Sequence, residues 1–239
     1  LFGSMDIKRH IFICVMALLV MGGSAQAQEQ VNQLDQNGAR HGLWKKYYEG
    51  TKQLRYTGTF NHGIEVGVFK YYCQSCGDQV VVIRDFDSIP GACAVTFYTD
   101  RGQLVSQGRM QDQKRIGPWV TYHKGGTTIM TKEHYKDDLL DGVKNTYYPN
   151  GLLAESCIYK QGLRQGKCSY YGPGGQIIKT FTYDNDQLHG PAEFYDLSGN
   201  LERTGIYSRD KKSGIWKTYV NGVVTQEEDF NDQKRSHER

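Results

Sequence analysis

Tyrosine recurs along this chain at a nearly constant interval, and this recurrence restricts the fold more than any other feature of the sequence. Successive members of the series are 24 to 26 residues apart. A repeat of roughly 20 to 50 residues is typical of proteins built from stacked units, each of which packs on its neighbours. We therefore expect eight units, one for each of these tyrosines: Tyr47, Tyr72, Tyr98, Tyr122, Tyr147, Tyr171, Tyr195 and Tyr219.

Other residues recur in register with the tyrosines. A glycine, here called the leading glycine, stands five residues before the tyrosine in seven of the eight units, and Cys93 stands there in the third. Sequences such as Pro149-Asn150-Gly151 follow the tyrosine and supply the positive-φ residues that tight β-hairpins need. About twelve residues after the tyrosine an aromatic residue closes most units, with Met110 in the third: Phe60, Phe86, Tyr135, Tyr159, Tyr183, Tyr207 and Phe230.

Each unit is therefore predicted to be a hairpin of two short strands. In one second strand, Leu153, Cys157 and Tyr159 share parity, so their side chains line one face. After residue 30 the sequence shows no convincing helical periodicity. A single hairpin is marginally stable at best, so the units must support one another. We expect an all-β fold in which tandem hairpin repeats over residues 38–230 form an elongated, twisted antiparallel sheet.

The N-terminal segment has the pattern of a signal peptide. Lys8 and Arg9 precede an apolar run at positions 11–21, which is too short to span a bilayer by itself. The Ala25-Gln26-Ala27 sequence is a small-residue cleavage site. We expect residues 1–27 to be a leader and signal helix, residues 28–37 an entry segment and residues 231–239 a polar disordered tail. The mature protein is predicted to be periplasmic or extracellular, in a bacterium.

Five cysteines remain after this cleavage, which allows two disulfides in an oxidising compartment. Cys73 and Cys76 lie in a predicted hairpin turn, where a structural disulfide, free thiols, or a redox or metal role stay open. If Tyr159 pairs with Gly166, antiparallel registry places Cys157 opposite Cys168. That pair is either a cross-strand disulfide or two buried core residues. Cys93 is left without an assigned role.

The sequence carries no motif that predicts catalysis, a cofactor site or a metal site. It lacks a G-x-S-x-G elbow, a phosphate-binding glycine loop and an H-E-x-x-H motif. Acidic residues in the turns lack calcium-loop spacing and are interpreted as solvated: Asp137, Asp138, Asp141, Asp184 and Asp186. With 29 basic and 26 acidic residues, the charge is nearly balanced and does not indicate nucleic-acid binding. We expect a protein that is not an enzyme.

Four aromatic residues stand two positions after a leading glycine and form either the core or a binding face: Trp44, Phe69, Trp119 and Trp216. Three positions separate each from the tyrosine of its unit, so on a straight strand the two point to opposite faces. A single thin sheet cannot fully bury both faces, and exposed apolar patches are often interaction sites. We therefore expect an interaction scaffold whose partner is another protein, with no small-molecule substrate.

The repeat resembles a variant of the MORN repeat found in exported bacterial proteins, many of them classed as YwqK-type antitoxins. The shared pattern is Gly-x-Trp-x-x-Tyr, then x-x-x-Gly-x-Leu, then Tyr-x-x-Gly-x-x-x-Gly, and it covers residues 38–230. One unit matches it in register through Gly142, Tyr147, Gly151, Leu153, Tyr159, Gly162 and Gly166. The third unit departs from the pattern, as do three turns in which aspartate replaces glycine (Asp138, Asp186 and Asp210).

This resemblance implies an elongated antiparallel sheet used for scaffolding or for binding protein or lipid. It also leaves open an antitoxin-like inhibitor of a partner protein. A peripheral lipid-binding or glycan-binding module is the remaining alternative, because stacked Trp and Tyr rings also suit sugars. The evenly spread charge argues against a lipid surface.

Overall fold

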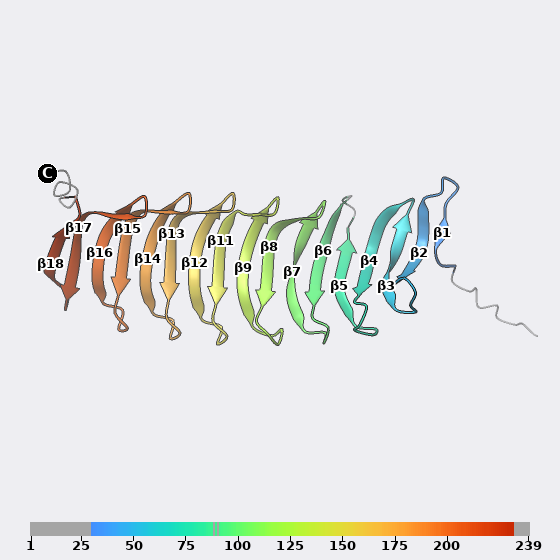
Figure 1. The fold of residues 1–239 in the computed structure, drawn as a ribbon, viewed down its shortest axis with the longest axis horizontal. Coiled ribbons are helices and arrows are strands. Elements are labelled where there is room, and N and C mark those ends of the chain that lie inside the picture. The colour runs from blue at the N-terminus through green and yellow to red at the C-terminus, as the bar shows by residue number, and fades with distance from the viewer. Residues whose placement is uncertain (1–29, 88, 90, 232–239) are drawn as a thin grey trace, which may run out of the picture.

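The chain forms one long antiparallel β-sheet. The computed structural model describes residues 30–231 except positions 88 and 90, and this part of the chain consists of strands and turns. Figure 1 shows the strands side by side along a rod, with the N-terminal and C-terminal strands at opposite ends. No helix in the described residues is long and apolar enough to cross a membrane. The predicted signal peptide and the tail from residue 232 onward lie outside the described residues.

Eighteen strands make up the sheet. Their bounds are β1 (Gln33–Leu34), β2 (Arg40–Tyr47), β3 (Leu54–Asn61), β4 (Ile64–Tyr72), β5 (Val80–Phe86), β6 (Ala92–Tyr98), β7 (Leu104–Gln111), β8 (Lys114–Tyr122), β9 (Ile129–Lys136), β10 (Leu139–Leu140), β11 (Gly142–Tyr147), β12 (Leu153–Lys160), β13 (Leu163–Tyr171), β14 (Ile177–Asp184), β15 (Gln187–Tyr195), β16 (Leu201–Ser208), β17 (Lys211–Val220) and β18 (Val223–Asp229).

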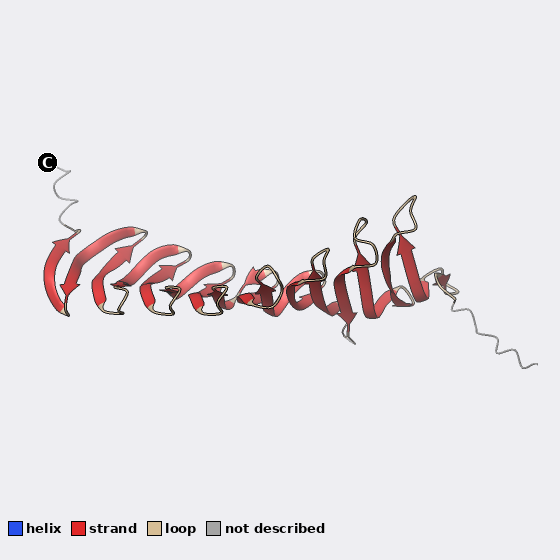
Figure 2. Cartoon of the chain, turned by 90° about the horizontal axis from the view of Figure 1, so that it is seen from below, coloured by secondary structure: helices blue, strands red, loops and turns tan. Residues whose placement is uncertain are grey.

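The strands follow one another as a meander, which confirms the prediction of tandem hairpins. Eight hairpins match the eight predicted units: β2/β3, β4/β5, β6/β7, β8/β9, β11/β12, β13/β14, β15/β16 and β17/β18. The expected entry segment contains β1, which pairs with β2. The short β10 lies between two units and pairs with β9, which also pairs with β11. Figure 2 shows that the strands are bowed, so each hairpin arches across the rod.

The recurring tyrosine has the same cross-strand partner type in every unit. It pairs with the apolar residue that follows the hairpin turn, as Tyr147 pairs with Leu153 and Tyr195 with Leu201. The register shifts immediately before the tyrosine, where a β-bulge ends the regular ladder. A bulge bends the strand and changes the direction of the next side chain. The β-bulge and the apolar cross-strand partner therefore recur at the same interval as the tyrosine.

The leading glycine lies in a second bulge, between one unit and the next. Between β12 and β13, Tyr159 pairs with Arg164 but Cys157 pairs with Cys168, so three residues including Gly166 oppose one. Gly166 has a φ of +83°, a conformation that glycine adopts without strain. The expected pairing of Tyr159 with Gly166 is therefore wrong, because the bulge displaces the register. The third unit lacks this bulge, and Cys93 pairs in regular register with Phe86.

Two-residue turns join most successive units, whereas positions 87–91 join the second unit to the third. In one of the two-residue turns Asn185 and Asp186 have φ values of 49° and 68°. Two positive φ angles are typical of the type I′ turn, which matches the twist of the flanking strands. Asparagine and aspartate tolerate this conformation better than most residues. Aspartate can therefore replace the glycine of the repeat pattern at this position.

Candidate functional site

The sheet has two chemically different faces. The inner face is defined by the residue two positions after each leading glycine, and Phe69, Trp119 and Trp216 are only 0%, 6% and 2% exposed there. Trp44, in the first unit, is half-buried. Three of the four residues considered for a binding face are thus core residues.

Each buried ring lies over a glycine of the preceding strand. A Cβ atom on Gly58, Gly108 or Gly205 would lie less than 3.0 Å from the ring of the residue eleven positions later. The indole Nε1 of Trp216 also donates to the backbone carbonyl of Ile206 at 3.2 Å. The ring needs the empty volume above glycine, and the hydrogen bond fixes its orientation. Core packing therefore depends on a pair of positions, i and i+11, rather than on one aromatic residue.

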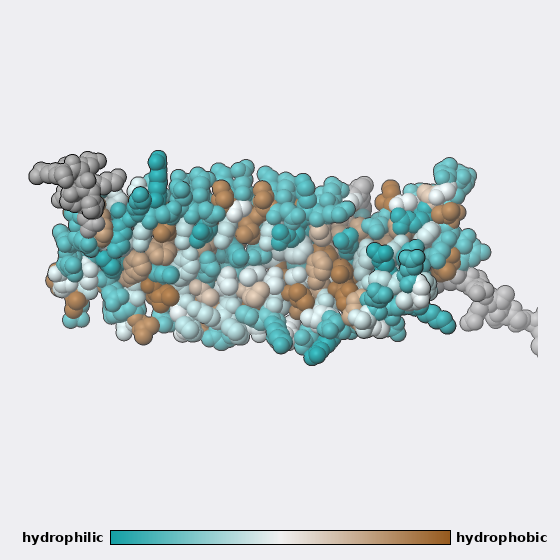
Figure 3. All heavy atoms as spheres, viewed as in Figure 1, coloured by the Kyte–Doolittle hydropathy of each residue, from teal (hydrophilic) through white to brown (hydrophobic). Residues whose placement is uncertain are grey.

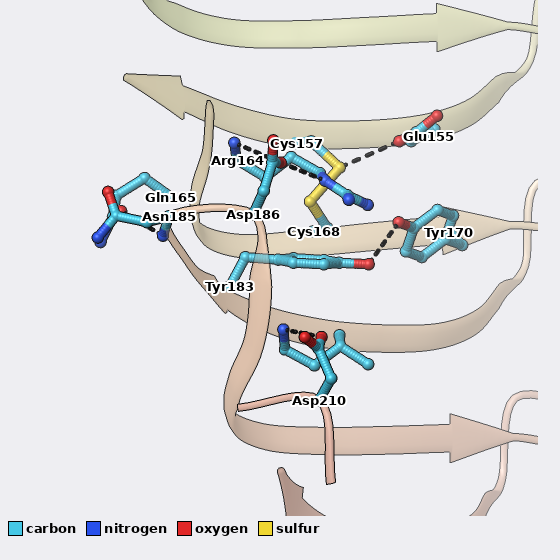
Figure 4. Close-up of polar contacts among 11 residues, drawn as sticks. Glu155, Cys157, Arg164, Gln165, Cys168, Tyr170, Tyr183, Asn185, Asp186 and Asp210 are labelled. Atoms are coloured by element: carbon cyan, nitrogen blue, oxygen red, sulfur yellow. Dashed lines mark hydrogen bonds and ion pairs between the residues drawn. A yellow bond between two sulfur atoms is a disulfide. The ribbon is translucent and has the colours of Figure 1, made fainter. Parts of the chain in front are cut away.

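The same two positions hold other complementary pairs in other units. They contain a disulfide, a ring opposite a small residue, and an ion pair with a nitrogen–oxygen distance of 3.2 Å: Cys157–Cys168, Phe181–Ala192 and Glu133–Lys144. Cys157 and Cys168 are 1% and 0% exposed, as buried as the rings that replace them elsewhere. Figure 4 shows this disulfide between its two strands, with Tyr170 on one side and Arg164 on the other. This pair of positions thus accepts several combinations of residues, each a complementary pair.

The structure contains both cysteine pairs considered from the sequence. Cys73 and Cys76 form a disulfide with a Cα–Cα distance of 5.4 Å, in the hairpin turn of the second unit. Cys157 and Cys168 form the second, with a Cα–Cα distance of 4.2 Å. Cys93 is a buried free thiol, and burial raises its pKa. A thiol that is both buried and hard to ionise is poorly reactive.

The outer face carries the recurring tyrosines. Their hydroxyl groups form hydrogen bonds with polar side chains. Gln107 donates to the Tyr122 hydroxyl at 3.1 Å, and the Tyr195 hydroxyl donates to Glu193 at 2.9 Å. Glu193 directly follows Ala192, which is buried on the inner face, so it points to the opposite side. The tyrosines therefore lie opposite the buried rings, on the face where their hydroxyls reach polar partners. All of them except the exposed Tyr47 are half-buried.

A row of branched apolar side chains also lies on the outer face. Each member is next in sequence to an inner-face residue and so points outward. Val143 pairs with Ile158 across β11 and β12, and Pro191 pairs with Ile206 across β15 and β16. Val143, Ile158, Ile206 and Ile215 are 44% to 51% exposed, and Pro191 is also exposed. We call Val143, Ile158, Pro191, Ile206 and Ile215 the outer apolar row.

Arginine–aspartate pairs connect successive inter-unit turns along one edge of the rod. The Asp186 carboxylate accepts hydrogen bonds from both the backbone N–H and the Nε of Arg164, at 2.9 and 2.8 Å. Two units earlier along the chain, the Asp138 carboxylate accepts the same two hydrogen bonds, from the backbone N–H and the Nε of Arg115. The arginine side chain lowers the pKa of each aspartate. These acids were expected to be merely solvated; the spacing of 22 to 23 residues between arginine and aspartate was the signal for this contact.

The opposite edge has a similar set of contacts, made by the residue after the recurring tyrosine. The hydroxyl of Tyr48 donates to the carbonyl of Tyr72 at 2.8 Å, and that of Tyr148 donates to the carbonyl of Tyr171 at 2.8 Å. The ring Nε2 of His123 lies 2.9 Å from another such carbonyl, that of Tyr147. Both long edges of the rod are therefore tied from unit to unit. The sequence reasoning missed these residues.

Shallow hollows interrupt the sheet surface, and in Figure 3 apolar side chains gather along the middle of the visible face between hydrophilic edges. One hollow of about 430 Å³ lies over Trp216 near the C-terminal end. A smaller one of about 190 Å³ adjoins Cys93. Within the described ranges, no three His, Cys, Asp or Glu side chains converge to hold a metal ion. The hollows and the two faces are the surfaces on which binding can be argued.

Comparison with known proteins adds no assignment to this geometry. No family model matches the sequence, and no curated protein matches it. The function of the chain is therefore inferred from its faces, its edges and its hollows.

Proposed function

We propose that the mature chain is an exported, non-enzymatic scaffold of MORN-like hairpin repeats that binds another protein through the outer face of its sheet. The observation that carries this proposal is the outer apolar row. Four of its members are 44% to 51% exposed. Single exposed apolar residues are common on protein surfaces, so the argument rests on the grouping of these side chains at one level of the sheet. The row consists of two groups, Val143 with Ile158 and Pro191 with Ile206 and Ile215, separated by β13 and β14. Grouped exposed apolar side chains with a polar surround are typical of protein interaction sites.

The rigidity of the rod supports the same function. Successive units are joined by the ladder, by the ring-over-glycine contacts and by the hydrogen bonds along both edges. A surface that is already ordered loses little conformational entropy when a partner binds. The outer row is therefore presented in a fixed geometry over several units. This is the property that a scaffold needs.

The cysteines support the exported location. Disulfides persist in oxidising compartments and are rare in the reducing cytosol. Two disulfides in one small β-protein fit the compartment that the N-terminal sequence predicts. The buried, poorly ionised Cys93 is the kind of thiol that survives in such a compartment without reacting.

Photo-crosslinking in the native envelope tests this proposal. A benzophenone amino acid at position 158, within the outer apolar row, is expected to capture a defined partner, whereas one at the inner-face position 170 captures none. The double variant Val143→Thr and Ile206→Thr keeps β-branched side chains, and so strand preference. It adds one hydroxyl group directly opposite position 158, at Val143, and one in the group on β15 to β17, at Ile206. We expect it to reduce capture at least tenfold.

Val68→Thr is the matched control, because Val68 is similarly exposed on the outer face but its cross-strand partner is the charged Asp85. This variant is expected to leave capture unchanged. Equal capture from positions 158 and 170, or capture that survives the Val143 and Ile206 double variant, contradicts an outer-face interface.

A further inference from the structure

The hollow over Trp216 lies on the inner face, opposite the proposed interface, and has its own chemistry. Its volume is about 430 Å³, within the range of roughly 300 to 1,000 Å³ that is typical of small-ligand sites. Phe194 and Tyr207 are half-buried and supply aromatic surface beside the buried Trp216 ring, and two cations, Arg203 and Lys212, line the hollow as well. These five residues come from three consecutive strands, β15, β16 and β17. The site is therefore held by the rigid ladder rather than by loops.

Arg203 is incompletely paired in this hollow. Its Nε is buried and has no hydrogen-bond acceptor among the described residues. Its nearest carboxylate oxygen, on Glu228, is 3.7 Å from Nη2, which is beyond hydrogen-bond distance. By contrast, Arg164 on the same rod donates its Nε to Asp186 at 2.8 Å. A buried donor without an acceptor costs free energy that an incoming acceptor can recover.

Lys212 adds a second cation without a carboxylate. Its ammonium lies 4.6 Å from the centre of the Trp216 ring and 4.7 Å from that of Phe230. Within the part of the chain that the structure describes, it makes no ion pair. Stacking on aromatic faces orients the charge but leaves its hydrogen-bond donors open. The Arg203 guanidinium lies 5.2 Å from the centre of the same Trp216 ring, so two cationic donor groups border this ring.

The geometry points to a binding site for a small organic carboxylate with an apolar body, either free or at the C-terminus of a polypeptide. The carboxylate would accept hydrogen bonds from Arg203 and Lys212, which relieves the unpaired guanidinium. Charge-assisted contacts of this kind are about twice as strong as neutral ones. The apolar body would rest on Phe194 and Tyr207, beside the buried ring of Trp216. This inference is independent of the outer-face proposal, because the two surfaces lie on opposite sides of the sheet.

The hollow beside Cys93 shows why this chemistry is specific to the Trp216 site. It too contains an arginine, Arg84, whose buried Nε lacks an acceptor. Its lining, however, includes both Glu65 and Asp112. Two acids against one cation disfavour an anion. The Trp216 hollow is lined by two cations and one acid, Glu202; Glu228 lies 3.7 Å from Arg203, and Lys212 makes no ion pair among the described residues. The C-terminal hollow is therefore the one suited to a carboxylate.

Nuclear magnetic resonance of the indole N–H groups tests the inference on the intact mature chain. The sequence contains three tryptophans, and the N–H of Trp119 matches that of Trp216 in burial and in its carbonyl acceptor. Titration with 3-phenylpropanoate is expected to shift the Trp216 signal and leave that of Trp119 unmoved. The uncharged 3-phenylpropanamide, at the same concentrations, is expected to shift neither signal.

Variants identify the groups that bind. Arg203→Gln and Lys212→Gln are each expected to weaken 3-phenylpropanoate binding at least tenfold. Lys217→Gln, which removes a cation paired with Glu227 at 3.1 Å, is the control and leaves binding unchanged. An unmoved Trp119 signal reports that each variant is folded, and Lys212→Gln tests the site by itself if Arg203→Gln does not fold. Equal binding of acid and amide, or binding that survives both variants, overturns the inference.

Two further probes distinguish the source of the ligand. Tighter binding of Gly-Gly-Phe than of 3-phenylpropanoate, lost when the peptide is amidated, indicates the C-terminus of a polypeptide. Tighter binding of the free acid indicates a small metabolite. Because these titrations read Trp216 directly, failure of outer-face crosslinking leaves this result intact, and the reverse is also true.

Discussion

The ring of Trp216 occupies the space directly above Gly205, eleven residues earlier on the neighbouring strand, so closely that a Cβ on the glycine would overlap it. Gly205 does not have the positive φ that commonly explains a glycine in a repeat. Glycine is required at position 205 because any larger side chain would overlap the Trp216 ring. The same relationship joins Gly108 to Trp119 and Gly58 to Phe69, which makes it a rule of this sheet.

Gly205→Ala is expected to destabilise the protein by about 1–3 kcal/mol, the usual cost of overpacking a well-filled core. Urea unfolding measures the change. Gly172→Ala is the control, since Gly172 also lacks a positive φ and an added Cβ would meet only the flexible side chain of Gln176. The account is contradicted if the two substitutions cost the same.

A chain that lacks residues 1–27, the proposed signal peptide, is expected to show one titratable thiol per molecule when it is unfolded without a reducing agent. Four of its five cysteines are paired, and Cys93 is the remaining thiol. In the folded state this thiol is expected to react much more slowly, because it is buried and its pKa is raised. Thiol counting with Ellman's reagent before and after unfolding measures both quantities. Five thiols in the unfolded chain would refute both disulfides.

The arginine–aspartate pairs predict a dependence of stability on acid pH. The pKa values of Asp138 and Asp186 are lowered in the folded state, so their stabilising contribution is present above the unfolded pKa of about 3.9. It is lost as the pH falls through the lower folded value. The double variant Asp138→Asn and Asp186→Asn is expected to show a flatter decline of melting temperature below about pH 4. An identical decline in the parent and the variant would show that the pairs do not contribute.

The sequence was sufficient to predict the hairpin architecture, because tyrosine, glycine and turn residues recur at every unit. Parity also placed the tyrosines and the buried rings on opposite faces. The bulge at Gly166 could not be predicted, because it depends on how two strands pair rather than on the order of residues in one strand. For the same reason the expected register around Tyr159 was wrong although the neighbouring cysteines do meet.

Whether an aromatic residue forms core or surface was also beyond the sequence. Phe69 and Tyr71 are both aromatic residues of β4, yet only Phe69 is fully buried, because Gly58 leaves room for it. The edge contacts of Tyr48 and Tyr148 were missed since only one tyrosine of each Tyr-Tyr pair keeps the strict period. Both the burial of a ring and an edge hydrogen bond depend on two positions in different units, so a single position does not predict them.

Exchange of one complementary pair for another tests the packing rule most directly. In the variant Cys157→Gly with Cys168→Trp, the disulfide position receives the glycine and ring found at Gly205 and Trp216, whereas Cys168→Trp alone places the ring against a retained Cys157 side chain. Under reducing conditions we expect urea unfolding to show the double variant more stable than the single one by about 1–3 kcal/mol. Equal stability of the two variants would contradict the claim that a ring at position i+11 requires glycine at position i.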